Sequence, residues 1–391
     1  MKKTKFNRKR TIALILSMLL VMQQSFALQV LATEITNGDG STIAPNGGDH
    51  TWNIKPDAIN GNNGFKQFGK IDLSQGDVLN FIYNYVKQTQ GTPTPNGSGG
   101  YDITVSDVHG NIDTFIALVN SGVNIQGIVN ALQSVGGALK NDGNLVFISP
   151  NGFVVGASGV LNVGNLSVVT PTQNSYKALS DYLDLPQKSE HYIKKSTLSY
   201  TVGDGHYTFT NDDYDFTKTV AKDTDKTFNI NTLTDGAGNS LILGEAGNNN
   251  VGKITIDGKV AARGDINLQG GTIANNGILL AGLGNNETAA LTGHEAANTL
   301  FTKLVNIDNL GTANTFVNNN GNITIKSVTG TSVGNGALVR NYGTGNVSIN
   351  NTGANGIAIA GEVSNPNGAT TITNSNGGLL VDTTGKILSG G

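Results

Sequence analysis

A glycine followed by a polar residue, and then by alternating apolar residues, recurs along this chain. Full copies begin at Gly143, Gly164, Gly252, Gly264, Gly321 and Gly345, and a variant begins at Gly368. The intervals 143 to 164, 321 to 345 and 345 to 368 are 21, 24 and 23 residues. A period in this range predicts a solenoid, because each unit can bury its apolar face only by stacking on its neighbours.

The residues after each glycine indicate which solenoid forms. Ile323 and Ile325 flank a Thr, and Val347 and Ile349 flank a Ser, so each strand has one buried and one wet face. Helical spacing and the Leu-x-x-Leu-x-Leu pattern are both absent. We therefore expect an all-β, right-handed parallel β-helix, with about a dozen coils stacked at ~4.8 Å into a rod of roughly 60 Å. A twisted β-sandwich is the alternative, since it is equally rich in short strands and turns.

The composition fits a fold with many turns and no covalent staples. Among 391 residues there are 53 Gly and 50 Asn, the two residue types that best tolerate left-handed backbone. There is no Cys, which excludes disulfides and thiolate chemistry. Stability must therefore come from burial and backbone hydrogen bonds.

The first 32 residues have the pattern of a secretory signal peptide. The basic stretch Met1–Arg10 is followed by an uncharged apolar run, Thr11–Met22, and by small-residue cleavage sites ending at Ala27 or Ala32. An apolar run of this length is shorter than the roughly 20 residues that span a bilayer. We expect a cleaved leader and no stable membrane insertion.

Removing this leader makes the chain acidic. Six basic residues leave with it, so 19 basic residues remain against 28 acidic ones, a net charge of −9. Such a balance argues against nucleic acid as a partner. It suits a protein exported through the periplasm to the cell surface or the medium.

Two segments interrupt the repeats. Charged and aromatic residues gather between Tyr176 and Asn231, where Ser175–Lys195 has the composition of a helix broken at Pro186. Thr89–Gly100 reads as a flexible loop. We expect both segments to leave the side of the solenoid.

The search for catalytic, metal and cofactor sites finds none. The known short motifs for zinc, nucleophilic serine and nucleotide binding are missing. The acidic run Asn211–Asp215 lacks the glycine turn of a calcium loop and is interleaved downstream with lysines, so we interpret it as a solvated loop. The histidines have no ligand spacing: His50, His109, His191, His206 and His294. The sequence predicts no enzyme and no cofactor.

Residues Asn144–Thr172 contain a Pro-Asn-Gly corner between two apolar strands. Pro150 fixes φ for the first position of a turn, and Asn151 and Gly152 can take positive φ at the next positions. This segment resembles the secretion domain of filamentous haemagglutinins, haemolysins and leukotoxin-type filamentous adhesins. Gly64–Asp77 and Asn120–Asn130 are similar to the parts of that domain that precede the motif.

The resemblance implies recognition by an outer-membrane transporter of the two-partner type, a barrel with periplasmic domains. It places this recognition on the corner motif, whose residues are Ser149, Pro150, Asn151, Gly152, Gly156, Asn162 and Gly164. Ser149 stands where the family usually has Asn. A literal Asn365-Pro366-Asn367-Gly368 lacks the following strand pattern, so we interpret it as an ordinary corner.

On this basis the chain divides into four parts. These are a signal peptide (1–32), a two-partner secretion domain (33–172), an extra-helical insertion with its return (173–250) and β-helix repeats that we expect to be truncated (251–391). We expect a secreted adhesin or toxin passenger that binds a ligand on a host or neighbouring cell. The alternatives are an autotransporter passenger without its barrel, and a β-helical polysaccharide lyase.

Overall fold

The computed structural model describes residues 32–46, 50–60, 62–90, 94–95, 101–102, 105–135, 138–183, 185, 196–202, 205–211, 218–219, 228–229, 234–235, 252–284 and 321–390. The chain divides into two compact units, Met1–Thr33 and Glu34–Gly391, and the described strands all belong to the second. The predicted signal peptide, apart from Ala32, lies outside the described residues. Asp212–Asp215, which form most of the predicted acidic run, also lie outside the described residues.

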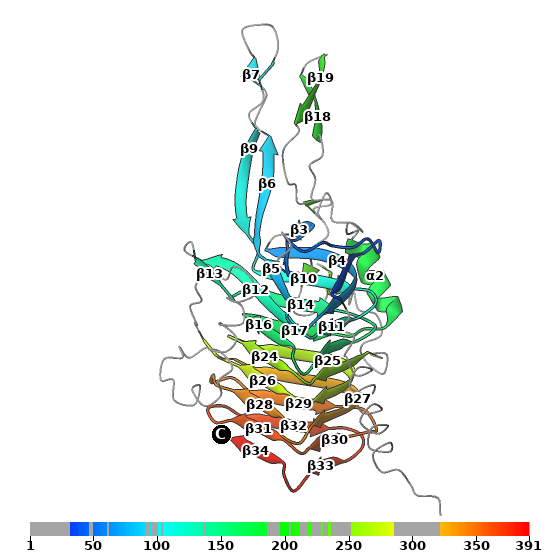
Figure 1. Cartoon of the computed structure of the whole chain (residues 1–391), viewed down its shortest axis with the longest axis vertical. Helices are drawn as coiled ribbons and strands as arrows, with labels where there is room; N and C mark the ends of the chain where they lie inside the picture. Colours follow the sequence, from blue (N-terminus) through cyan, green and yellow to red (C-terminus); the bar gives the residue numbers. More distant parts are fainter. Residues whose placement is uncertain are drawn as a thin grey trace, which may run out of the picture. The chain divides into compact units, whose positions relative to one another are not determined.

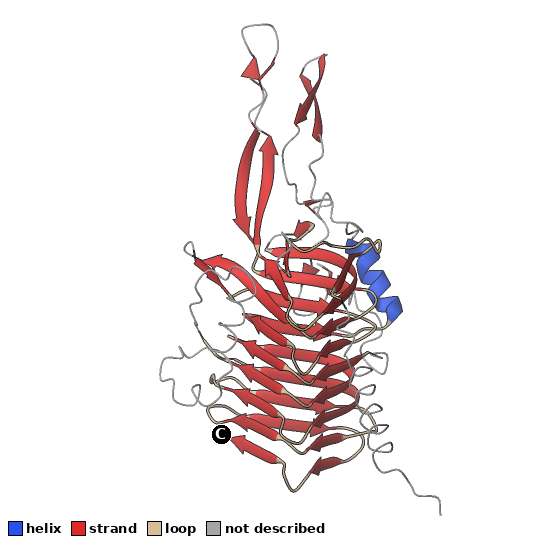
Figure 2. Cartoon of the chain, in the orientation of Figure 1, coloured by secondary structure: helices blue, strands red, loops and turns tan. Residues whose placement is uncertain are grey.

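Almost all the ordered elements are strands, and the two large sheets are parallel (Figures 1 and 2). In the described part the only helix is α2 (Gln173–Leu183). The predicted all-β class is therefore confirmed.

Successive circuits of the chain stack as coils, and each coil crosses three faces. The first face contains the amino-terminal halves of β4 (Asn63–Leu73), β25 (Ile266–Asn275) and β27 (Ile323–Val333), with β10 (Thr114–Val119), β14 (Asn144–Ile148), β17 (Asn165–Val169), β29 (Val347–Asn351) and β32 (Thr370–Asn374). The second face contains the carboxyl-terminal halves of the same three long strands, with β11 (Val123–Ile125), β15 (Phe153–Val155), β23 (Lys253–Ile256), β30 (Ile357–Ile359) and β33 (Leu379–Val381).

The third face is the separate 10-stranded sheet. Its strands that stack along the coils are β2 (Thr51–Ile54), β5 (Val78–Ile82), β12 (Ile128–Val135), β16 (Val160–Val163), β24 (Lys259–Ala262), β26 (Ile278–Ala281), β28 (Leu338–Asn341), β31 (Glu362–Asn365) and β34 (Lys386–Ser389). The described residues thus make eight coils, beginning at β4, β10, β14, β17, β25, β27, β29 and β32. The part of the chain that the structure describes therefore contains fewer coils than the expected dozen.

The coils stack in register, so like side chains lie over like. On the first face, Leu145 aligns with Leu166, and Leu166 with Ile266. The alignment continues through Ile323 to Val347, and all five side chains are buried in one hydrophobic cluster. Side chains alternate between the two sides of a strand. Pairing of equivalent residues therefore keeps every second side chain in the core of the stack. The core is one column enclosed by the three faces.

Three departures interrupt this winding without disturbing the stack. The chain leaves after Tyr83 and returns at Ile112, with β6 (Asn84–Gln90) and β9 (Val105–Asn111) paired antiparallel between them. It leaves again after Thr170 and returns at Gly252, yet β14 and β25 both pair with β17. The third departure, after Gly284, was not predicted, and the chain returns at Gly321.

The short elements within and beside these departures pair antiparallel, except for one parallel pair. They are β13 (Ala138–Lys140) on β12, β7 (Thr94–Pro95) on β8 (Tyr101–Asp102), β18 (Ser196–Val202) on β19 (Gly205–Asn211), β21 (Phe228–Asn229) on β22 (Thr234–Asp235), and β20 (Lys218–Thr219) parallel to β3 (Ala58–Asn60). The segment predicted as a flexible loop, Thr89–Gly100, therefore contains strand β7. The repeat copy at Gly252 begins a strand of the second face, not of the first like the other copies.

Helix α2 covers the outer side of the first face in the first four coils. Thr172 caps the helix, since its Oγ1 accepts a hydrogen bond from the Ser175 backbone at 3.1 Å. Tyr176, Leu179 and Leu183 follow at helical spacing and are buried. They pack with outward-facing residues of the sheet, namely Phe65, Ile116, Leu118, Val146, Ile148 and Val169.

The outward side chains change character where this cover ends. In register, Phe65, Ile116 and Val146 are followed by Ser167, Asn267, Thr324 and Ser348. The polar outward positions predicted from the repeats are thus confirmed for the later coils. For the earlier ones the prediction was wrong, because a helix keeps water away from them.

The amino-terminal end of the column is closed by antiparallel strands. Strands β1 (Glu34–Asn37) and β3 both pair antiparallel with β4, and Trp52 lies over the first coil with 6% of its surface exposed. Lys66 occupies the inward register position that Ala117 fills in the next coil, so a cation is buried in the first coil. Its Nζ lies 2.7 Å from Asp57 Oδ2. Burial lowers the pKa of Lys66, against the opposing effect of Asp57.

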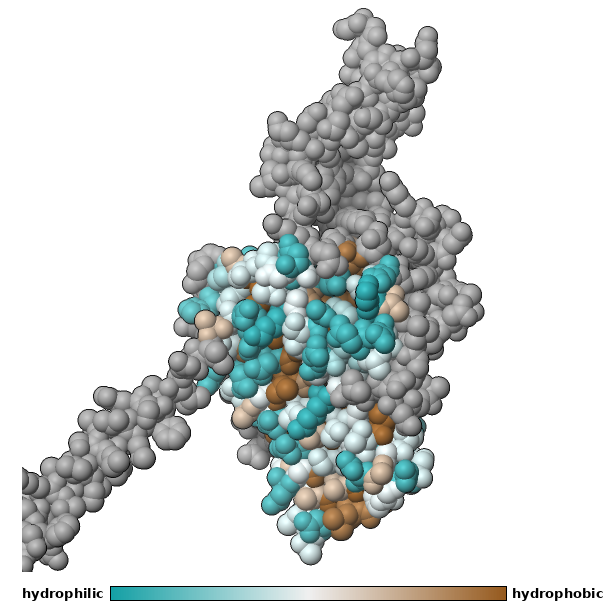
Figure 3. All heavy atoms as spheres, turned by 90° about the vertical axis from the view of Figure 1, so that its right-hand side faces the viewer, coloured by the Kyte–Doolittle hydropathy of each residue, from teal (hydrophilic) through white to brown (hydrophobic). Residues whose placement is uncertain are grey.

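The opposite end of the column exposes core positions. Leu379 aligns with Ile357, and Ile387 with Val363, but they are 52% and 39% exposed. Leu380, Val381 and Leu388 are exposed as well. Figure 3 shows an apolar patch at this end of the described surface.

Replacing Lys66 with Met should weaken the closed end. The change leaves the buried Asp57 carboxylate without its cation, which costs about 3–5 kcal/mol. Urea unfolding followed by fluorescence of Trp52, the one Trp of the chain, reads this region directly. The double variant Lys66→Met with Asp57→Leu should recover most of the loss, because neither charge is then buried.

Lys70→Met is the matched control. Lys70 pairs with Glu34 at 2.7 Å, but these side chains are 38% and 55% exposed. An exposed pair contributes less than about 1 kcal/mol. A shift for Lys66→Met no larger than that for Lys70→Met would show that the buried pair does not hold the cap.

Candidate functional site

The predicted motif lies at the corner between the first and second faces of the third coil. Gly152 has φ +100°, and its backbone N–H donates to Ser149 O at 3.4 Å across the turn. A Cβ on Gly152 would lie 2.8 Å from Lys253 O of the next coil. The positive φ and the close approach of Lys253 O both require glycine at this position. Asn151 was also expected to be able to take positive φ, but it does not do so.

The two side chains beside this turn differ in accessibility. Asn151 is exposed, and its Nδ2 donates to Asn120 O of the preceding coil at 2.6 Å. Ser149 is fully buried at an inward position, and its Oγ has no hydrogen-bond partner. In later coils this register position is occupied by Asn351 and Asn374, which do bond to each other at 2.8 Å. Asn151 is therefore the side chain of the corner that a partner can reach.

The motif glycines allow close approach between coils. Gly156 N–H donates to Ile125 O at 2.8 Å, and a side chain there would collide with Gln126. Gly164 N–H donates to Gly143 O at 2.9 Å, and Gly264 N–H to Gly164 O at 2.8 Å. These glycines therefore form part of the stacking corners and do not contribute groups to a separate site.

Asn162 lies away from the Pro-Asn-Gly corner, at the end of a buried amide ladder on the third face. Asn130 Nδ2 donates to Asn80 Oδ1, and Asn162 Nδ2 to Asn130 Oδ1, each at 3.0 Å. Asn53 begins the ladder, accepting from Asn80 at 2.9 Å. The next coil places Ala261 in register, so Asn162 Oδ1 has no partner. The seven motif residues thus belong to one coil and its corners but do not converge on one point.

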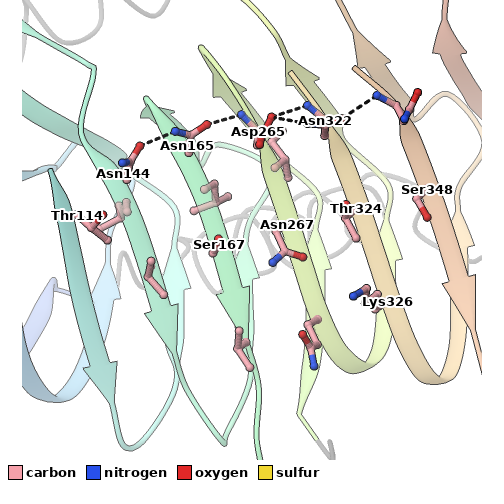
Figure 4. Close-up of a pocket in the computed structure, with 17 residues that line it drawn as sticks. Thr114, Asn144, Asn165, Ser167, Asp265, Asn267, Asn322, Thr324, Lys326 and Ser348 are labelled. Atoms are coloured by element: carbon pink, nitrogen blue, oxygen red, sulfur yellow. Dashed lines mark hydrogen bonds between the residues drawn. The ribbon is translucent and has the colours of Figure 1, made fainter. Parts of the chain in front are cut away.

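On the first face, the polar residue after the glycine of each repeat forms a second ladder (Figure 4). Asn165 Nδ2 donates to Asn144 Oδ1, and Asn165 Oδ1 accepts from the backbone of Asp265. Asp265 Oδ1 accepts from the Asn322 backbone at 2.6 Å, and Asn322 Oδ1 from the Asn346 backbone at 2.8 Å. The sequence pattern therefore marks a position that bonds one coil to the next.

A groove of about 680 Å³ runs beside this ladder on the outer side of the first face. Its central row is Ser167, Asn267, Thr324 and Ser348, one from each of four successive coils, and Figure 4 shows them in line. These four side chains are half-buried and form no hydrogen bond to the described part of the chain. The repeats predict the polar outward side chains of these strands but not the groove, because a hollow on the surface of a sheet is not a property of any one strand.

The remaining chemistry of the described residues is sparse. His50 Nδ1 lies 2.9 Å from Asp77 Oδ1 with the His side chain largely exposed, and no group of three or more potential metal ligands occurs in the part that the structure describes. Within that part, no helix has the length and apolarity needed to cross a membrane. His191, His206 and His294 have no described side chains.

No family model and no curated protein matches the sequence. Among solved structures, a crystal structure of a filamentous hemagglutinin secretion domain is similar to this chain, with a TM-score of 0.28 and 14% identity. The match covers 92% of this chain and 95% of that chain. The likeness is too distant for any residue to be transferred.

Gly152→Ala should destabilise the chain more than Gly336→Ala. Both glycines have positive φ, which costs an alanine about 1–2 kcal/mol. Only Gly152 has a backbone oxygen in the way, since nothing lies within 4 Å of a Cβ on Gly336. Overpacking at Gly152 should add at least about 1 kcal/mol. Equal losses in urea unfolding would show that the contact with Lys253 O is unimportant.

Asn130→Ala should cost more than Asn162→Ala. The first change breaks two side-chain hydrogen bonds and leaves Asn80 Oδ1 and Asn162 Nδ2 unpaired. Each unpaired buried group costs about 1–3 kcal/mol of stability. The second breaks one bond and also removes an oxygen that has no partner. Thermal unfolding of the two variants side by side tests this order, and the reverse order would mean that the ladder adds little stability.

Proposed function

We propose that this chain is an exported, non-enzymatic passenger whose amino-terminal part is recognised by an outer-membrane two-partner transporter. In this proposal the stacked coils are a right-handed parallel β-helix that serves as a scaffold for binding a host or neighbouring cell. It locates the mature protein in the medium or at the cell surface, after cleavage of the leader.

The observation that carries the proposal is the placement of the Pro-Asn-Gly corner. Its sequence context, Asn144–Thr172, resembles the secretion domain of filamentous adhesins. The corner exposes Asn151, and a hydrogen bond from its Nδ2 to Asn120 O at 2.6 Å orients that side chain. An exposed polar residue fixed by a rigid corner is a suitable contact for another protein.

A non-enzymatic role is supported by the polarity of the first face. Catalysis on stacked strands needs acids or bases clustered on adjacent coils. The groove contains one carboxylate, Asp265, and one ammonium group, Lys326, among neutral side chains. Turnover of pectin, alginate or hyaluronan by the purified chain would favour the lyase alternative instead.

The chain offers an internal control for recognition. Pro366-Asn367-Gly368 repeats the Pro-Asn-Gly tripeptide at a later corner. Asn367 is exposed like Asn151, and its Nδ2 donates to Tyr342 O of the preceding coil at 3.3 Å. The two asparagines are therefore alike in exposure and in bonding to the preceding coil, but they lie at different corners. Asn151 lies between the first and second faces and precedes a glycine with positive φ, whereas Asn367 lies between the third and first faces and precedes a glycine without it.

Export can test the proposal with this pair. The full chain is co-expressed with candidate two-partner transporters in a Gram-negative host, and the protein in the medium is measured. Asn151→Ile should reduce export at least tenfold, while Asn367→Ile leaves it near the level of the unchanged chain. Retention of the unchanged chain in the periplasm with every transporter, or equal export of both variants, would contradict the proposal.

A fragment series locates the end of the export unit. Residues 33–172, fused to the leader, are predicted to suffice, but they lack α2 and so expose the outward apolar side chains of Phe65, Ile116 and Val146. We expect residues 33–185 to accumulate in a folded, protease-resistant form and residues 33–172 to be degraded after export. Equal protease resistance would show that the helix is dispensable.

A further inference from the structure

We infer that the groove on the first face binds a linear, neutral oligosaccharide lying along the stack of coils. This inference deepens the surface-binding part of the proposed function and does not depend on transporter recognition. It rests on the central row formed by Ser167, Asn267, Thr324 and Ser348, which belongs to four successive coils.

The central row offers free hydrogen-bonding groups at a regular interval. Each of its side chains is half-buried and forms no hydrogen bond to the described part of the chain. Register places them on adjacent parallel strands, and therefore about 4.8 Å apart. A ligand that matches them must repeat its own donors and acceptors at about this interval.

The interval favours a sugar chain over a peptide. An extended peptide presents side chains on one side every second residue, about 6.8 Å apart, and so falls out of step with the strands. One pyranose ring of a linear glycan is close to one strand spacing in length. Its hydroxyls both donate and accept, as do Ser, Thr and Asn side chains.

The charges of the groove exclude polyanions. Asp265 and Lys326 are the charged residues among those that line it, so the lining has no net charge. A nucleic acid or an acidic glycan needs several cations for its repeated negative groups. Apolar outward residues, which a lipid would need, lie under α2 and are buried.

The central row begins at the edge of the part of the sheet that α2 covers. Val146 and Val169 border the groove where α2 ends its cover, and the central row begins at Ser167. Asn267 and Thr324 lie in the middle of the row, where a ligand of four or more sugar units would contact both. Substitutions of Asn267 and Thr324 therefore test oligosaccharide binding at this groove most directly.

The test uses the purified full chain and hexasaccharides of glucose linked β-1,4, glucose linked α-1,4 and N-acetylglucosamine linked β-1,4. Calorimetric titration should show saturable binding of at least one of the three. The disaccharide of the same series should bind at least tenfold more weakly, because it spans fewer strands. Hexagalacturonate should not compete.

Two variants and one control locate the binding. Asn267→Leu and Thr324→Val each remove the hydrogen-bonding group of one member of the central row and should weaken binding roughly three- to tenfold. Thr371→Val changes the register-equivalent outward residue of the last coil, which does not line the groove, and should leave binding unchanged. Both groove positions face outward, so thermal unfolding should hardly change.

The inference is overturned if none of the three neutral hexasaccharides binds, if hexagalacturonate binds equally well, or if Thr371→Val weakens binding as much as Thr324→Val. Export of the unchanged chain is measured in the transporter assay, beside its oligosaccharide binding. Normal export without oligosaccharide binding would overturn the groove inference and leave transporter recognition intact. Lost export with retained binding would do the reverse.

Discussion

The structure depends on in-register parallel pairing between successive coils, within each face; one irregularity, at Gly270–Thr272 of β25 against β27, lies where the chain turns from the first face to the second. Because side chains alternate along a strand, a slip of one residue would turn Leu166, Ile266 and their equivalents outward. Register is therefore enforced by burial along the whole column, and backbone hydrogen bonds run from each coil to the next. The chain contains no Cys, so no disulfide can fix the coils. Instead, neighbouring coils constrain one another.

Polar ladders reinforce this register, one within the third face and one beside the glycines that open the first-face strands. An amide that bonds to its equivalent in a neighbouring coil, as Asn130 does to Asn80 of the preceding coil, loses that partner if the coils slip. Apolar burial alone is tolerant of exchanges between Leu, Ile and Val. The ladders add a directional requirement that apolar contacts lack. Asn side chains supply most of these hydrogen bonds, which gives one physical reason for the high Asn content.

The sequence sufficed to predict those features that repeat. Strand period, coil length and the glycine that opens each first-face strand are local patterns, so the all-β class and the position of most coils followed from them. The exception is Gly252, where the same pattern opens the second face. That assignment depends on where the chain rejoins the stack after an excursion, and no local pattern records it. The departure after Gly284 was missed for the same reason.

The candidate site was predictable only in part. The turn at Pro150-Asn151-Gly152 follows from residue types, and its place at a corner is what the sequence indicated. The separation of Asn162 from that corner does not follow, because it depends on which face each strand occupies. The outward apolar residues of the first coils could have indicated a covering element, since Ile116 and Val146 break the alternation with polar residues. Helix α2 is the reason for that break.

The winding also determines how the molecule responds to a load. Each coil of the described stack is bonded only to the coils before and after it, so a pull along the stack loads one boundary between coils at a time. The first coil differs from the others, because the buried ion pair of Lys66 and Asp57 and the antiparallel strands β1 and β3 also hold it. The described coils should therefore separate one at a time under load, and the first coil should resist longest.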